Sequence, residues 1–186
     1  DGTIFSFFAN GADPQFIEYI RLRHMTLRNA GVAIQYGHAG GGPTDYKIGN
    51  NRFEHLNLTN NNYAVYVPSE WAVSQNNEFR NCLFSGNNRS IRWTAGPWRA
   101  PRMENCLFYQ TAGLVIEGAT IINNSIFHAS GSGVHVFYPE DASRGDYNLF
   151  FLTNGAALGP LFTKLAVHTA NTDGSDKHSL IGEDPL

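Results

Sequence analysis

The chain has no apolar run near the roughly 20 residues that a membrane-spanning helix requires, and only two of its 186 residues are cysteines. No His or Cys pairs stand at the spacing of a zinc site. Charged residues make up 16%, and the net charge of −3 provides no basic surface for nucleic acid. No signal peptide is visible, but the chain starts at Asp1 rather than Met, which is consistent with the removal of one. These absences exclude a membrane-spanning helix, a zinc site of the usual spacing and a nucleic-acid partner.

Apolar residues, glycine and asparagine are the types that the chain does contain in quantity. A hydrophobic content of 42% over this length is enough to bury the core of one domain. Few charges combined with many Gly and Asn residues are typical of extracellular β proteins with many turns. The composition therefore predicts a secreted or cell-surface protein.

Six stretches repeat one six-residue phrase, in which an apolar residue comes first, Asn or His usually third, and a large apolar residue last. The stretches are Leu22–Leu27, Phe53–Leu58, Phe79–Phe84, Met103–Phe108, Ile122–Phe127 and, more loosely, Gly145–Phe150. Their last residues stand 31, 26, 24, 19 and 23 apart. A repeat of about this length with variable spacing is typical of a solenoid whose coils differ in loop length.

The third residue of the phrase marks a bend between two short strands. Side chains alternate along an extended chain, so the first and last apolar residues share a face only if the chain bends between them. Asn tolerates the left-handed backbone conformation that such a bend needs. We therefore predict a ladder of Asn81, Asn105 and Asn124, continued by His55 and His24.

A second apolar pair follows each phrase and indicates a third strand. The pairs are Val32 and Ile34, Val65 and Val67, Ile91 and Trp93, Leu114 and Ile116, and Val134 and Val136. Three short strands per coil predict a right-handed parallel β-helix, a single-stranded solenoid of about six to seven coils. An antiparallel sandwich is the alternative, but it favours tight two-residue hairpins, which this chain rarely offers.

Equivalent positions of neighbouring coils should stack in the core. Phe84, Phe108 and Phe127 are predicted to form a single internal column. Cys82 and Cys106 also share a phrase position, at a separation that allows a disulfide. We favour two stacked buried thiols, because in-register parallel neighbours direct their side chains alongside each other.

The four later insertions all leave the same edge, just after the third strand of a coil, and should form a wall along one side of that strand's sheet. Coil four, with only Gly118 and Ala119 at this place, leaves a gap in the wall. His38 and Asp45 lie in the first and longest insertion and are expected to be solvated.

The whole chain, 1–186, is predicted to be one β-helix domain from a longer protein, with an irregular last coil and tail over 153–186. The tail contains alternating oxygen side chains near Asp173 and Asp176 that faintly match a calcium loop. The glutamate expected later in such a loop is missing, so an ordinary turn is favoured and no cofactor is predicted.

The phrases, together with Asp146–Phe150, Asp176–Ser179 and Asp184-Pro185, resemble secreted bacterial right-handed parallel β-helix repeat proteins of the pectate-lyase-like superfamily. The resemblance covers roughly residues 17–186. It implies the fold but not one activity, since that superfamily includes polysaccharide lyases, hydrolases, epimerases, adhesins and phage tail proteins. In its enzymes the substrate usually lies along the outer face of one sheet, bordered by long loops. The calcium-binding acidic cluster of the lyases and the paired Asp residues of polygalacturonases have no match here.

The best candidate site is the outer face of the third-strand sheet. If Val32, Val65, Ile91, Leu114 and Val134 point inward, one outward row contains Ala33, Tyr66, Arg92, Val115 and His135. A second row then contains Gln35, Pro68, Thr94, Glu117 and Phe137. This alignment predicts that Arg92, Glu117 and His135 lie together on consecutive coils. The insertions should add aromatic rings that stack on sugars, from Trp71, Trp98 and Tyr138.

Two classes of function fit this face. An acidic polysaccharide would place a uronate carboxylate on Arg92, and His135 or Tyr66 would move the proton in a lyase or epimerase reaction. A hydrolase would instead need two carboxylates, such as Glu117 with Glu140 or Asp141. The structural alternative for Arg92 and Glu117 is a cross-strand ion pair of small energetic value. The competing class is a non-enzymatic adhesin, stalk or filament whose partners are neighbouring protein subunits.

Overall fold

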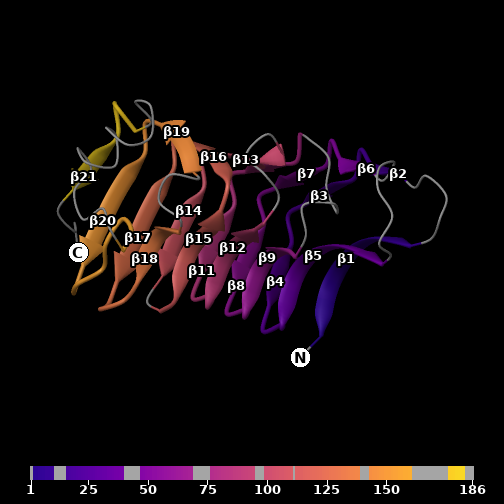
Figure 1. The fold of residues 1–186 in the computed structure, drawn as a ribbon, viewed down its shortest axis with the longest axis horizontal. Helices are drawn as coiled ribbons and strands as arrows, with labels where there is room; N and C mark the ends of the chain where they lie inside the picture. The colour runs from indigo at the N-terminus through magenta and orange to yellow at the C-terminus, as the bar shows by residue number, and fades with distance from the viewer. Residues whose placement is uncertain are drawn as a thin grey trace.

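The structure is a computed structural model whose described residues form only strands and turns. It describes residues 2–10, 16–39, 47–68, 76–94, 99–110, 112–138, 143–160 and 176–182. Within these ranges, every pairing between named strands is parallel. The coils stack along the long axis of the molecule, from β1 near one end to β21 at the other (Figure 1). The predicted parallel β-helix with three short strands per coil is confirmed.

Three sheets form the walls of the solenoid, one for each strand of a coil. Sheet I contains β3 (Arg21–Arg23), β7 (Arg52–Glu54), β10 (Glu78–Arg80), β13 (Arg102–Glu104), β16 (Thr120–Asn123) and β19 (Ser143–Asp146). Sheet II contains β4 (Thr26–Arg28), β8 (Asn57–Thr59), β11 (Leu83–Ser85), β14 (Leu107–Gln110), β17 (Ile126–Ser130), β20 (Leu149–Thr153) and β21 (Leu180–Gly182). Sheet III contains β1 (Thr3–Asn10), β5 (Val32–Ala39), β9 (Tyr63–Val67), β12 (Arg89–Trp93), β15 (Leu114–Gly118) and β18 (His135–Tyr138). A small fourth sheet pairs β2 (Phe16–Glu18) with β6 (Lys47–Gly49).

The bend between sheets I and II occurs at the third residue of the phrase, as predicted. The backbone there is left-handed, with φ between 51° and 59°, at His24, His55, Asn81, Asn105, Asn124 and Tyr147. Asn adopts this conformation more readily than other residues with a Cβ. The three asparagines of the set are exposed, and the rings of His24 and His55 stack at a centroid distance of 4.9 Å. This ladder therefore lies on the outside of the solenoid.

Large aromatic side chains fill the interior in columns parallel to the axis. Along sheet II, Phe84, Phe108, Phe127 and Phe150 stack ring on ring, with centroids 4.8, 4.7 and 5.0 Å apart. All four side chains are fully buried. The predicted internal column is therefore confirmed, and it extends one coil further than predicted.

Cys82 and Cys106 are both buried, and neither forms a disulfide. The contact with Cys82 and the burial of the group both raise the pKa of the Cys106 thiol. The favoured prediction of two small stacked thiols is therefore confirmed.

Buried amide ladders at two other corners were not predicted. Asn51 donates to Asn77 at 3.2 Å, and Asn61 donates to Asn87 at 3.0 Å. Each ladder also satisfies backbone groups, because Asn61 donates to Leu27 O and its Oδ1 accepts from Ala30 N. A buried backbone group without a partner is costly, so these amides stabilise corners that sheet hydrogen bonds do not reach.

We expect Phe108→Ala to lower the free energy of unfolding by about 3–5 kcal/mol, because it opens a cavity between two stacked rings. Urea or guanidinium unfolding followed by circular dichroism measures the loss. Leu107→Ala is the matched control, since Leu107 is 40% exposed on the adjacent outward position. Equal losses for the two variants would contradict the stacked core.

Candidate functional site

The outer face of sheet III carries two rows of side chains whose register differs from the predicted one. The first row contains Gln35, Tyr66, Arg92, Glu117 and Tyr138. The second row contains Val32, Tyr63, Arg89, Leu114 and His135. The first row therefore forms one line across five consecutive coils. Its residues lie closer together than the predicted rows had placed them.

The predicted rows are wrong at Ala33, Val115, His135 and Phe137, and also at Pro68 and Thr94, which lie two residues beyond the row that contains Gln35 and Glu117. Ala33 is fully buried, Val115 is 1% exposed, and Phe137 packs against Phe127 in the core. The cause lies within the strands of sheet III, where two consecutive residues after an outward first residue are both buried. Val115 and Ile116 form one such pair. An alignment on the first apolar residue of each strand therefore shifts some strands relative to others.

Five residues of the two rows form one connected cluster, which we call the Arg–Tyr patch: Tyr63, Tyr66, Arg89, Arg92 and Glu117. Glu117 forms ion pairs with Arg89 at 3.0 Å and with Arg92 at 3.3 Å. The patch therefore contains two cations and one anion, a net charge of +1. Arg92 and Glu117 do form the cross-strand ion pair that the sequence raised as the alternative.

Tyrosine rings support both guanidinium groups of the patch. Tyr63 and Tyr66 stack at a centroid distance of 4.8 Å. The Arg89 guanidinium donates to the Tyr63 hydroxyl at 2.8 Å, and that of Arg92 lies 5.4 Å from the Tyr66 ring centre. Burial alone would lower the pKa of Arg92. The Tyr63 hydroxyl and the Glu117 charge outweigh burial and raise this pKa above its usual value. Arg92 therefore remains a cation and does not exchange protons near neutral pH. Tyr63 and Arg89 were not predicted, because the shifted register did not include their row on the outer face.

His135 lies in the second row, beside Leu114 rather than beside Arg92 and Glu117. Its Nδ1 is buried and makes no hydrogen bond with the described part of the chain. His135 thus lies with Arg92 and Glu117 on three consecutive coils of one face, as predicted, but it does not share the row of Arg92 as the predicted alignment had it. The leucine of coil four separates His135 from Arg89.

The remaining predicted residues divide into described and undescribed ones. Tyr138 ends the first row and is 47% exposed. Trp71, Trp98, Glu140, Asp141, Asp45 and Asp173 lie outside the described residues, as does the side chain of His38. Asp176 is buried and accepts hydrogen bonds from Asn148 and Ser179. Among the described residues, no group of three or more His, Cys, Asp and Glu side chains is placed to hold a metal ion.

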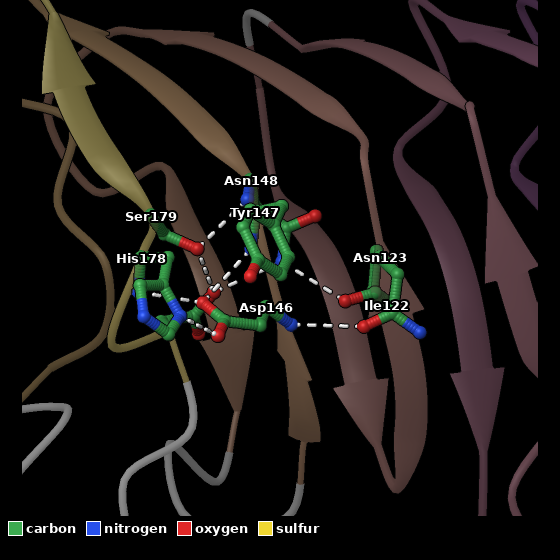
Figure 2. Close-up of polar contacts among 8 residues, drawn as sticks. Ile122, Asn123, Asp146, Tyr147, Asn148, His178 and Ser179 are labelled. Atoms are coloured by element: carbon green, nitrogen blue, oxygen red, sulfur yellow. Dashed lines mark hydrogen bonds and ion pairs between the residues drawn. The ribbon is translucent and has the colours of Figure 1, made fainter.

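A polar cluster at the C-terminal coil was not among the predicted site residues (Figure 2). His178 Nδ1 lies 2.6 Å from Asp146 Oδ2, and the backbone N–H of His178 donates to Asp146 Oδ1 at 2.7 Å. The ring of His178 stacks on that of Tyr147 with centroids 5.0 Å apart. Asp146 ends β19, and His178 comes just before β21, so the cluster attaches the last described strand to the solenoid.

This cluster has the hydrogen bonds of a structural latch. Ser179 Oγ donates to Asp176 and accepts from Asn148 N, so the hydroxyl is not directed at His178. Burial alone would raise the pKa of the Asp146 carboxyl. The hydrogen bonds from His178 and Tyr147 outweigh this effect and lower the pKa below its usual range. Asp146 therefore stays ionised and holds the turn that leads into β21.

A family model described as a right-handed beta helix region matches residues 7–158. No curated protein and no solved structure matches the chain. In the described part of the chain no helix is long and apolar enough to cross a membrane.

We expect Asp146→Asn to lower stability at neutral pH and to flatten the dependence of unfolding free energy on pH in the acidic range. The pKa of Asp146 is lower in the folded chain than in the unfolded chain. Its contribution is therefore complete above the unfolded value of about 3.9 and is lost as the pH falls through the folded value. Urea unfolding from about pH 6 to about pH 3 measures this change. Lys177→Gln is the control, and a wild-type pH profile for Asp146→Asn would contradict the latch.

Proposed function

Because the chain belongs to the right-handed β-helix family, whose fold hosts many functions, we propose a function from its side chains: binding of an acidic polysaccharide along the outer face of sheet III. The Arg–Tyr patch supports this proposal. It combines stacked aromatic rings, which suit sugar faces, with two guanidinium groups, which suit carboxylates.

The geometry of the first row favours an extended polymer over a small molecule. Parallel strands repeat every 4.8 Å or so, and the row crosses five coils from Gln35 to Tyr138, which is roughly 19 Å. The row runs along the solenoid axis with aromatic residues at Tyr66 and Tyr138. A polysaccharide chain laid along this axis would meet a polar or aromatic side chain on every coil.

Because Arg89 and Arg92 share the carboxylate of Glu117, the patch retains positive charge for an anionic ligand. Arg89 and Arg92 divide one anion between them, so each has donors left for a second carboxylate. An ion pair at a partly exposed surface is worth about 0–1 kcal/mol. A uronate can therefore take the place of Glu117 on one guanidinium at a small energetic cost.

A lyase or epimerase reaction on the bound polymer is the second candidate, and the position of Tyr66 favours it. Arg92 would neutralise the uronate carboxylate, while a proton carrier would stand next to it. Tyr66 is that neighbour, with its ring under the Arg92 guanidinium, whereas His135 belongs to the other row. In the absence of such a reaction, the same face would serve a secreted or surface protein that attaches to acidic glycans.

We expect the protein to bind polygalacturonate or alginate and not a neutral dextran, and to do so less tightly as salt is added. Arg92→Gln and Tyr66→Ala should each weaken binding about fivefold to tenfold, because each removes one of the two interactions with a uronate. Affinity electrophoresis or isothermal titration calorimetry measures the effect.

Arg28→Gln provides the matched control for charge, since Arg28 is exposed on sheet II. The absence of binding by the wild type, or an equal loss with Arg28→Gln, would overturn the proposed face. Ultraviolet absorbance of the unsaturated product detects a lyase, and inversion at C5 of the uronate, followed by NMR, detects an epimerase. Either reaction should be abolished by Tyr66→Phe, and binding with neither reaction leaves the non-enzymatic role.

A further inference from the structure

A polar hollow lies on a different wall of the solenoid from the Arg–Tyr patch, where the chain enters sheet I. Its volume is about 520 Å³. It is lined by Tyr19, Ile20, Arg21, Asn50, Arg52, Asn76, Glu78 and Arg102, together with the buried Asn51. None of these residues belongs to the Arg–Tyr patch. The volume is within the range of about 300–1,000 Å³ that is typical of small-molecule sites.

The conformation of Tyr19 has no explanation in the packing of the described chain. Tyr19, Asn50 and Asn76 occupy the same turn of successive coils, with φ of 61°, 53° and 67°. Asn suits this left-handed turn, whereas a bulky residue is strained in it. The other tyrosine with this backbone, Tyr147, stacks on His178, but Tyr19 is 79% exposed and has no ring partner in the described part of the chain. An aromatic ring is therefore presented to solvent at the rim of the hollow.

The asparagine side chains of this turn form a chain of hydrogen bonds, and the amide oxygen at one end of the chain is unoccupied among the described residues. Asn76 Nδ2 donates to Asn50 Oδ1 at 3.1 Å, and Asn50 Nδ2 donates to Glu18 at 3.0 Å. Asn76 is exposed, and its Oδ1 accepts no hydrogen bond from the described residues. This oxygen is therefore available for a hydroxyl group in the hollow.

The cations of the hollow exceed the carboxylates that could pair with them. Arg52 pairs with Glu78 at 3.0 Å, and Glu78 is also held by Arg80 at 2.5 Å. Arg21 is engaged with Glu54. Arg102 follows Glu78 in the register, and its exposed guanidinium has no ion pair or hydrogen bond within the described residues. The hollow therefore presents an unneutralised guanidinium beside carboxylates that are already paired.

We propose that this hollow binds a single uronate, that is, a pyranose that carries a carboxylate. The guanidinium of Arg102 binds the carboxylate, the ring of Tyr19 packs on the sugar face, and Asn76 Oδ1 accepts from a hydroxyl group. The site does not depend on polymer binding at sheet III, because the two sites share no residue.

Isothermal titration calorimetry with monomeric galacturonate tests the site, with galactose and acetate as the neutral and sugar-free probes. We expect galacturonate to bind most tightly, and Arg102→Gln and Tyr19→Asn to weaken it about tenfold or more. Tyr19→Asn is informative because Asn is the residue that the neighbouring coils place in this turn. The variant should keep or raise the melting temperature while it loses the sugar.

Two further variants locate the binding. Arg144→Gln is the matched control, since Arg144 lies exposed in the same row of sheet I, two coils beyond Arg102. Arg144→Gln should leave the affinity for galacturonate unchanged, and so should Arg92→Gln in the Arg–Tyr patch. The proposal is overturned if galacturonate does not bind, if acetate binds as tightly, or if Arg92→Gln abolishes binding that Arg102→Gln and Tyr19→Asn preserve.

Discussion

The parallel, in-register pairing of successive coils is the constraint on which the rest of the structure depends. Each strand lies beside its equivalent in the next coil. A residue type that recurs at one position of the repeat therefore forms a column whose members are about 4.8 Å apart. Inward columns become ring stacks such as Phe84 on Phe108 on Phe127. At the corners, where sheet hydrogen bonds end, the same register turns Asn61 and Asn87 into a buried amide ladder. The core and its polar corners thus follow from one repeat.

The same register arranges charge on the outside. In sheet I the outward row reads Arg23, Glu54, Arg80 and Glu104 along successive coils, so opposite charges become neighbours. Arg80 pairs with Glu104 along this row, and Glu54 pairs with Arg21 of the adjacent row, each at small energetic gain. The two proposed binding sites lie where the alternation fails, at the two arginines that share Glu117 and at Arg102, which has no ion pair among the described residues. The two proposed sites therefore arise from the same rule and its local exceptions.

The left-handed turns show how one backbone conformation takes on different roles. Asn81, Asn105 and Asn124 occupy the turn at little strain, and they simply cover the bend. Tyr147 occupies it as part of the latch, where its ring stacks on His178 and Asp146 holds the turn before β21. Tyr19 occupies a different left-handed turn, at the entry to sheet I, and its ring is exposed. The ring stack on His178 accounts for Tyr147 in this conformation, and the proposed sugar contact would account for Tyr19.

The sequence by itself determined the solenoid, the bend at the third residue of each phrase, the phenylalanine column and the stacked free thiols. Each of these depends on spacing within one short phrase, and spacing is visible in the chain. Only the tertiary structure decided the outward rows of sheet III, since two consecutive buried residues within each strand interrupt the alternation. This interruption places His135 in another row than Arg92 and adds Tyr63 and Arg89 to the outer face. It also decided the contact of Asp146 with His178, 32 residues apart, and the hollow that gathers Tyr19, Asn76 and Arg102 from separate coils. Such sites depend on how coils of unequal length align, and no local pattern in the chain records that alignment.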